Sequence, residues 1–198
     1  MAFEIHPYAP QFLPDLYRIC LLTGDSGNDA SDLYQHPELL GDVFAVPYVT
    51  LEPDLTFVLT DVAGACGYVL GTQDTRAFGR WMNGEWLPPL REKYPLRAVP
   101  QGFQDGWLVR FVHQDWEPSK WADEYPAHLH IDLLPRAQGQ GMGRRMLETF
   151  LGRLRELGVP GVHLGTGWRN RRAVAFYEHL GFARLEDREG VLVFGKKL

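Results

Sequence analysis

The chain has 198 residues, of which 45% are hydrophobic and 23% are charged, a balance typical of a globular protein with a sizeable core. The formal net charge of −5 argues against a nucleic-acid-binding surface as the main role. No stretch is close to the length of about 18 apolar residues that a membrane span needs. The two cysteines, Cys20 and Cys66, lack metal-site spacing and are typical of a reducing compartment such as the cytoplasm. We expect one domain over 1–198, without a signal peptide.

A short strand and a helix are expected first, at 2–6 and 14–22. Pro14 suits the first turn of that helix, because the amide that proline lacks would have no partner there. The following segment, 23–32, is rich in Asp, Gly and Ser. Two interpretations stay open for it: a mobile surface loop, or an acidic rim that attracts a cationic amine.

The next elements are a short helix and a pair of strands. The helix is expected over 38–45, with Pro47 ending it. Two apolar runs, 55–60 and 66–71, are joined by a turn around 61–64 and predict an antiparallel hairpin.

Residues 73–125 differ in composition from the rest of the chain, because these 53 residues contain five of the six tryptophans and five prolines. Within them, 76–86 is compatible with a helix, and 105–114 with either a helix or a strand. The aromatic side chains either pack this inserted segment onto the core or line a substrate pocket and exclude water from it.

A strand, a proline turn and a glycine-rich helix start follow the aromatic segment. Apolar and polar residues alternate over 128–133, and Pro135 ends this strand. Three glycines at every second position then open a helix expected over 142–157; they are Gly139, Gly141 and Gly143. The first amides of a helix have no internal partner, and Arg144 and Arg145 add positive charge beside them. The geometry predicts a pocket for phosphate or pyrophosphate.

The remaining chain predicts one more helix between strands. The expected elements are a strand at 162–166, a helix at 171–180 with Asn170 as N-cap and Gly181 just beyond its end, and strands at 182–186 and 191–196.

Two motifs in this second half resemble those of one family. The segment Gln138-x-x-Gly141-x-Gly143 resembles the acetyl-CoA signature of the GNAT superfamily of N-acetyltransferases. A later family motif is matched by Asn170, Ala173, Tyr177, Gly181 and Phe182. Four segments, HPYAP, TGD, HPELLGD and YPAHLHIDLLPRAQG, are further similar to bacterial acetyltransferases that resemble the C-terminal acetyltransferase-like domain of O-GlcNAc hydrolase. The resemblance implies an α/β fold with a mixed, mostly antiparallel central sheet flanked by helices, from which the insertion at about 73–125 departs.

The resemblance also implies acetyl-CoA as cofactor and assigns roles to residues. Backbone amides from Gln138 to Arg144 would hold the pyrophosphate, and Leu133 and Leu134 would offer backbone groups to the pantetheine arm and the thioester carbonyl. Tyr177 would protonate the leaving thiolate, unless it is a core aromatic. The implied cofactor-binding residues are Ile131, Leu133, Leu134, Gln138, Gly139, Gln140, Gly141, Met142, Gly143, Arg144, Asn170, Ala173 and Tyr177.

A base is needed to take a proton from the amine that accepts the acetyl group. Strand alternation places His128, His130 and Asp132 on one face, and we expect Asp132 to orient a histidine such as His130. Alternatively, these three residues line the other side of the sheet and bond to helices. The base could then come from Asp105, Glu124 or water.

A metal site is not expected, although HLHID resembles the start of the metal box of metallo-β-lactamase-like hydrolases, because Leu133 stands where the final histidine belongs. The predicted function is N-acetyl transfer to a small-molecule or peptide amine, which includes histone acetyltransferase-like activity. Nucleic acid and membrane partners are not expected, and the oligomeric state is not predicted. The alternative is a non-catalytic module that binds CoA or a protein partner.

Overall fold

The computed structural model describes residues 2–98, 102–188 and 190–198 and shows one seven-stranded sheet. The strand order is β1-β2-β3-β4-β5-β7-β6, and only the β4–β5 pair is parallel. The strands are β1 (Glu4–Pro7), β2 (Thr56–Asp61), β3 (Gly64–Thr72), β4 (Ala127–Leu133), β5 (Gly161–Gly167), β6 (Ala183–Arg188) and β7 (Val191–Lys197). The expected mixed, mostly antiparallel sheet is confirmed.

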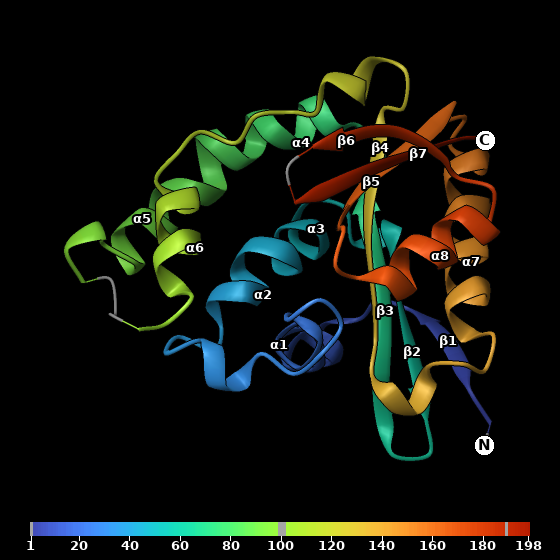
Figure 1. Cartoon of the computed structure of the whole chain (residues 1–198), viewed down its shortest axis with the longest axis horizontal. Coiled ribbons are helices and arrows are strands. Elements are labelled where there is room, and N and C mark those ends of the chain that lie inside the picture. Colours follow the sequence, from blue (N-terminus) through green and yellow to red (C-terminus); the bar gives the residue numbers. More distant parts are fainter. Residues whose placement is uncertain (1, 99–101, 189) are drawn as a thin grey trace.

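Helices cover both faces of this sheet (Figure 1). They are α1 (Leu13–Thr23), α2 (Leu39–Phe44), α3 (Val46–Leu51), α4 (Thr75–Trp81), α5 (Leu87–Lys93), α6 (Asp105–Val112), α7 (Met142–Glu156) and α8 (Arg171–His179). Helix α1 packs on β3 and β4, and α7 packs on β2, β3 and β4 from the opposite face. The buried side of α7 carries Met146, Leu147, Phe150, Leu151 and Leu154, which is the stripe expected of an amphipathic helix.

One sequence expectation about a proline was wrong, and one helix was not predicted. Pro47 does not end a helix: the break falls at Ala45, where φ is −129°, and Pro47 lies in the first turn of α3. The helix that was not predicted is α5, which contains Pro88 and Pro89. Both lie at the start of α5, where the amide that proline lacks is not needed. The segment expected as a helix or a strand at 105–114 contains the helix α6.

Residues 73–125, which we call the arm, carry α4, α5 and α6 and extend away from the sheet (Figure 1). A π-helical turn, Met82–Trp86, joins α4 to α5. The arm is held by the buried carboxylate of Asp42 in α2, which accepts hydrogen bonds from the hydroxyls of Tyr17 and Tyr94 at 2.6 and 2.7 Å. Lys93 lies 2.7 Å from the same carboxylate. Because a buried charge needs such partners, Asp42 fixes the arm against α1 and α2.

Candidate active site

The strands β4 and β5 separate after two residue pairs. They are paired only at Ala127–Val162 and His128–His163, so the rest of β4 has no neighbour on that side. The amide of Leu134 donates to the carbonyl of Cys66 at 2.8 Å, toward β3. Since backbone groups alternate in direction along an antiparallel pair, those of Ile131 and Leu133 point the other way, into the gap beside β5.

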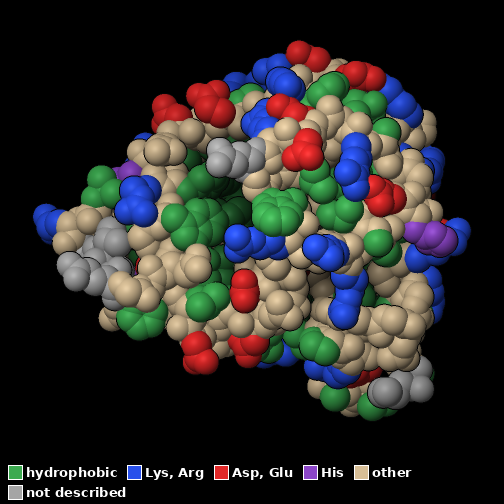
Figure 2. Space-filling view, in the orientation of Figure 1, with side chains coloured by type: hydrophobic (Ala, Val, Ile, Leu, Met, Phe, Trp, Pro, Cys, Tyr) green, Lys and Arg blue, Asp and Glu red, His purple; other side chains and the backbone are tan. Residues whose placement is uncertain are grey.

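An open cleft of about 1110 Å³ occupies this gap, which is large enough for a nucleotide-sized ligand. It extends from Ile131, Asp132 and Leu133 along the loop before α7 and is closed on the other side by the start of α8. Lys and Arg side chains gather over the α8 side of the molecule (Figure 2). Sequence reasoning missed three arginines that line the cleft there, Arg169, Arg171 and Arg172, although the run WRNRR at a helix start was a visible signal.

The loop before α7 has the form of an anion cradle. Gly139 and Gly141 have φ of 72° and 74°, the left-handed conformation that side chains rarely adopt. A Cβ built on either glycine would meet nothing within 4 Å, so the space in front of both is open. Within the described part of the chain, no carbonyl or side chain accepts from the amides of residues 139–144. These amides, at the positive end of a 15-residue helix, fit a pyrophosphate.

Two glutamines hold the cradle by hydrogen bonds. The side-chain nitrogen of Gln138, Nε2, donates to the carbonyl of Leu133 at 2.7 Å, and the side-chain oxygen, Oε1, accepts from Arg172. Gln138 thereby joins the end of β4 to the start of α8. Gln140 donates to the carbonyl of Arg136 at 2.7 Å, so its side chain tightens the loop and does not line the cleft.

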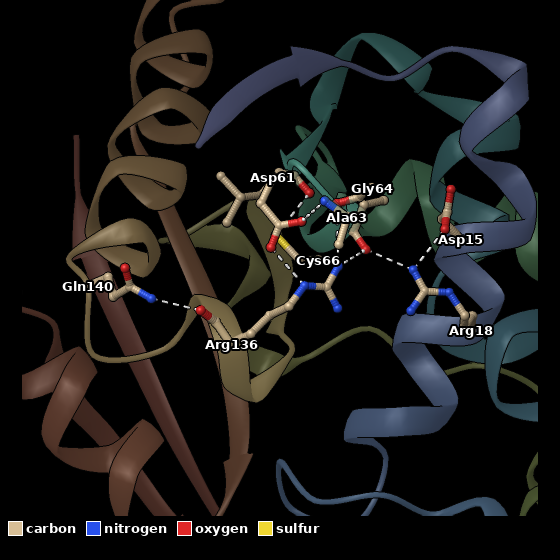
Figure 3. Close-up of polar contacts among 10 residues, drawn as sticks. Asp15, Arg18, Asp61, Ala63, Gly64, Cys66, Arg136 and Gln140 are labelled. Carbon is tan, nitrogen blue, oxygen red and sulfur yellow. Dashed lines mark hydrogen bonds and ion pairs between the residues drawn. The ribbon is translucent and has the colours of Figure 1, made fainter. Parts of the chain in front are cut away.

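Arg136 anchors the same loop to the β2–β3 hairpin (Figure 3). Its guanidinium lies 2.8 Å from the carboxylate of Asp61, and this contact holds the pKa of Asp61 below its ordinary value. Arg136 and Arg18 of α1 also donate to the same carbonyl, that of Ala65, at 2.9 and 2.7 Å. The cradle is therefore fixed to two other elements before any ligand binds.

A tight turn after α1 forms a further rim of the cleft. Asp25 and Asn28 exchange backbone hydrogen bonds around Ser26 and Gly27, whose φ values are 54° and 92°. A Cβ on Gly27 would lie 3.7 Å from the side-chain nitrogen of Asn170, so the turn faces the start of α8. Of the two interpretations of 23–32, the acidic rim is not supported, because the turn lines the cleft with the uncharged residues Ser26, Gly27 and Asn28. The aspartates of the segment do not line the cleft.

Asn170 and Ala173 lie where the second motif predicts. The Asn170 oxygen accepts from the amide of Ala173 at 3.0 Å, which confirms Asn170 as the N-cap of α8. Both residues line the cleft. The prediction for Leu134 was wrong, because its amide donates to Cys66 and its carbonyl accepts from Ala137 at 2.9 Å. The side chains of Leu134 and Met142 are buried, so Met142 can offer only its amide to a ligand.

Asp132 of β4 and Tyr177 of α8 both line the cleft. Tyr177 packs against Phe182 and Phe194, with ring centroids 5.6 and 5.7 Å away. Burial raises the pKa of Tyr177, and the charge of Asp132 adds to that rise. Burial also raises the pKa of Asp132, against the opposing effect of neighbouring hydroxyls. Tyr177 is therefore protonated at neutral pH, and Asp132 is a stronger base than an exposed aspartate.

The expected pairing of His130 with Asp132 does not form. His130 hydrogen-bonds through Nε2 to the Tyr48 hydroxyl of α3 at 3.0 Å, and burial lowers its pKa to about 4. Side chains two residues apart on one strand face start about 6.8 Å apart, and His130 turns to Tyr48 rather than to Asp132. His130 does not line the cleft.

The hydrogen-bond network fixes the tautomers of both histidines. The Thr75 hydroxyl donates to the carbonyl of Pro126 at 2.7 Å, so His128 Nδ1 must donate to Thr75 at 2.8 Å. His128 is neutral, because burial lowers its pKa, and its Nε2 accepts from the Tyr48 hydroxyl at 2.9 Å. His130 Nε2 then donates to Tyr48, and His130 Nδ1 keeps a lone pair.

The other predicted alternatives for the base serve the fold. Asp105 accepts from the amides of Gln35 and His36, both at 2.9 Å, and Glu124 lies 3.1 Å from Lys197.

Among the described residues, no group of three or more His, Cys, Asp or Glu side chains could hold a metal ion. In the same part of the chain, every helix is too short or too polar to span a bilayer.

Comparison with known proteins identifies the family. A sequence profile of the "Acetyltransferase (GNAT) family" matches residues 73–182, more than half of the chain. The chain belongs to this family. A crystal structure of SsHAT has a TM-score of 0.92 and 41% identity, and the match covers 100% of this chain and 98% of that one.

Curated relatives of this GNAT protein include Protein O-GlcNAcase of Rattus norvegicus, 27% identical over 203 residues. That match covers 99% of this chain and 22% of the relative, so the chain spans about a fifth of that protein's length. Mycothiol acetyltransferase of Thermomonospora curvata is 36% identical over 81 residues, which is 41% of this chain and 26% of the relative. The PaiA N-acetyltransferase of Thermoplasma acidophilum, solved with coenzyme A, shares the fold at a TM-score of 0.58 and 13% identity over the full length of both chains.

Proposed function

We propose that this GNAT protein is an acetyl-CoA-dependent N-acetyltransferase that transfers the acetyl group directly to an amine in a ternary complex. The observation that carries the proposal is that Asp132 and Tyr177 line the same cleft, close enough for the charge of Asp132 to raise the pKa of Tyr177. The anion cradle of Gly139 and Gly141 lines that cleft as well. A cleft with both an anion site and an acid–base pair fits a long anionic acyl donor.

The chain's own residues would hold acetyl-CoA along the cleft. The amides of 139–144 would bind the pyrophosphate, and Arg171 and Arg172 lie across from them to balance its charge. The backbone groups of Ile131 that point into the gap would pair with the pantetheine amides in place of a neighbouring strand, and the amide of Leu133, whose carbonyl accepts from Gln138, would face the thioester. Bound acetyl-CoA supplies the acyl thioester, whose carbonyl the amine attacks.

Each proton has an assigned place in the proposed reaction. Asp132 takes a proton from the ammonium form of the acceptor, which frees the nitrogen lone pair to form the new C–N bond. The Leu133 amide donates to the thioester oxygen while negative charge develops on it. Tyr177 donates its hydroxyl proton to the sulfur as the C–S bond breaks. The second proton lost by the new amide nitrogen restores Tyr177.

We place the acceptor in the hollow between the arm and the sheet, where hydrophobic side chains gather (Figure 2). Phe44 of α2 links the two sides of this region: its ring centroid is 5.9 Å from His130 of β4 and 6.1 Å from Trp107 of α6. The neutral His130, with a lone pair on Nδ1, is suited to accept a hydrogen bond from an acceptor N–H. A small-molecule or peptide amine is the acceptor that we propose.

Calorimetry and a thiol-release assay together test this function. We expect acetyl-CoA to bind and to be consumed in the presence of amines from a broad panel of small molecules and peptides. The absence of the expected His130–Asp132 pair, since His130 bonds to Tyr48 instead, favours a second candidate, a CoA-binding module without turnover. Binding without turnover by any amine between pH 6 and 9 would establish the module, and absence of binding would exclude both candidates.

A further inference from the structure

Tyr68 of β3 lies directly across the ladder from Asp132 of β4. Residues paired in this way place their side chains on the same face of a sheet, with Cβ atoms about 5 Å apart. That face is covered by α1, which packs on both strands. Tyr68 therefore lies beside the proposed catalytic carboxylate, on the β3 side and away from the gap between β4 and β5.

The Tyr68 hydroxyl is an unpartnered polar group inside the protein. The residue has no exposed surface, and its hydroxyl has no hydrogen-bond partner within the part of the chain that the structure describes. An unsatisfied buried hydroxyl costs free energy, so native proteins keep few of them, and those they keep need an explanation. Burial raises the pKa of Tyr68 well above its ordinary value, and the nearby side chains of Asp132 and of Cys20 in α1 raise it further.

The other side chains around Asp132 either donate their proton to another group or are weak hydrogen-bond donors. The Thr23 hydroxyl donates to the carbonyl of Ile19 at 2.7 Å. Burial raises the pKa of Cys20 to about 12, so it remains a thiol, which is a weak donor. Tyr177 faces Asp132 from the cleft side and spends its proton on the leaving sulfur in the proposed reaction. Tyr68 is the strong donor left for the buried side of the carboxylate.

We propose that Tyr68 is a positioning residue for acetyl transfer: its hydroxyl donates to the ionised carboxylate of Asp132 and holds that carboxylate toward the cleft. This inference rests on the proposed function, because it assigns Tyr68 a part in the same reaction. Tyr68 does not line the cleft and so acts only through Asp132. A donor to the charged form opposes the effect of burial and keeps Asp132 ionised at neutral pH.

The sign of the effect follows from that hydrogen bond. Tyr68→Phe keeps the ring and removes the donor, so the ionised form of Asp132 becomes less stable and its pKa rises further. The acid limb of the pH–rate profile is the fall in kcat/KM at low pH, where Asp132 becomes protonated. In Tyr68→Phe this fall should occur at higher pH than in the wild type, by about one pH unit or more. We expect about tenfold lower kcat/KM on the acid limb and equal values at high pH, where Asp132 is ionised in both proteins.

The test compares the wild type, Tyr68→Phe and Thr56→Val. Thr56 is the matched control, because its hydroxyl is also buried and unpartnered but lies in β2, one strand farther from the cleft. For each protein we would record the pH profile of kcat/KM for the amine, and the affinity for acetyl-CoA by calorimetry. The Asp132 carboxyl would also be titrated by carbon-13 NMR, with its signal assigned from Asp132→Asn.

The expected result is a rise in the acid-limb pKa and in the Asp132 carboxyl pKa for Tyr68→Phe alone, with unchanged acetyl-CoA affinity. A lower melting temperature without either shift would show a purely structural role and overturn the inference. If the wild type consumes no acetyl-CoA, the proposed function fails. The NMR titration still decides whether Tyr68 stabilises the ionised Asp132.

Discussion

The glycine cradle can be tested by placing a carboxylate in it. In Gly141→Glu, the new side chain would occupy the open space in front of the α7 amides and oppose the pyrophosphate by bulk and charge. Gly158→Glu is the matched control. Gly158 has φ of 73°, has open space around its Cβ position, and lies just past the other end of the same helix.

The control variant, Gly158→Glu, is expected to lose more stability than Gly141→Glu. Left-handed backbone costs a residue with a side chain about 1–2 kcal/mol. A carboxylate gains about 0.3–1 kcal/mol at a helix N-terminus and loses about as much at the C-terminus. Gly141→Glu should therefore cost about 1 kcal/mol and Gly158→Glu about 2 kcal/mol. In a chain of this size each kcal/mol lowers Tm by about 2–4 °C.

Binding should follow the opposite order. We expect calorimetry to show acetyl-CoA affinity at least about 100-fold weaker in Gly141→Glu, which corresponds to about 2.7 kcal/mol, and unchanged affinity in Gly158→Glu. The less destabilised variant would then be the one that loses the cofactor, so unfolding could not account for the result. Wild-type affinity in a folded Gly141→Glu would show that the pyrophosphate binds elsewhere.

Three further variants test the remaining contacts. Tyr177→Phe should lower kcat at least about tenfold in the thiol-release assay with acetyl-CoA affinity unchanged, and full activity would remove Tyr177 from the acid role. Asp132→Asn should abolish the acid limb of the pH–rate profile along with most turnover, whereas a limb that persists would belong to another group. Arg136→Gln should lower Tm at pH 7. Because Arg136 depresses the pKa of Asp61, its stabilisation is present above the ordinary aspartate pKa and is lost as pH falls below it, so the Tm difference should shrink in acid.

The sequence predicted the parts of the fold and site that depend on local pattern. Every expected strand is present, because period-two alternation and flanking turns report strands directly. Gly139 and Gly141 were recognised for their position before a helix, and the structure gives the reason in their positive φ. Asn170 was recognised as an N-cap by the same local logic.

Long-range contacts account for what the sequence did not predict. The bond that engages His130 comes from Tyr48, 82 positions earlier in the chain, and no spacing rule connects the two. The turn at Ser26 reaches the cleft only because α1 delivers it opposite Asn170. Helix α5 is short and carries its two prolines in the first turn, so its local sequence offers little periodicity by which to predict it.

The wrong prediction for Leu134 follows from the alternating direction of backbone groups along a strand. Leu133 and Leu134 were both expected to serve the pantetheine arm, yet neighbouring backbone groups on a strand point in opposite directions, so only one of them can. The backbone amide of Leu134 points toward β3, where it donates to Cys66, and the backbone amide of Leu133 points into the gap beside β5. The same alternation puts the Asp132 side chain on the α1 face, beside Tyr68. In the proposed reaction, the backbone of β4 therefore serves the acyl donor at Leu133, while the side chain of the preceding residue, Asp132, takes the acceptor's proton.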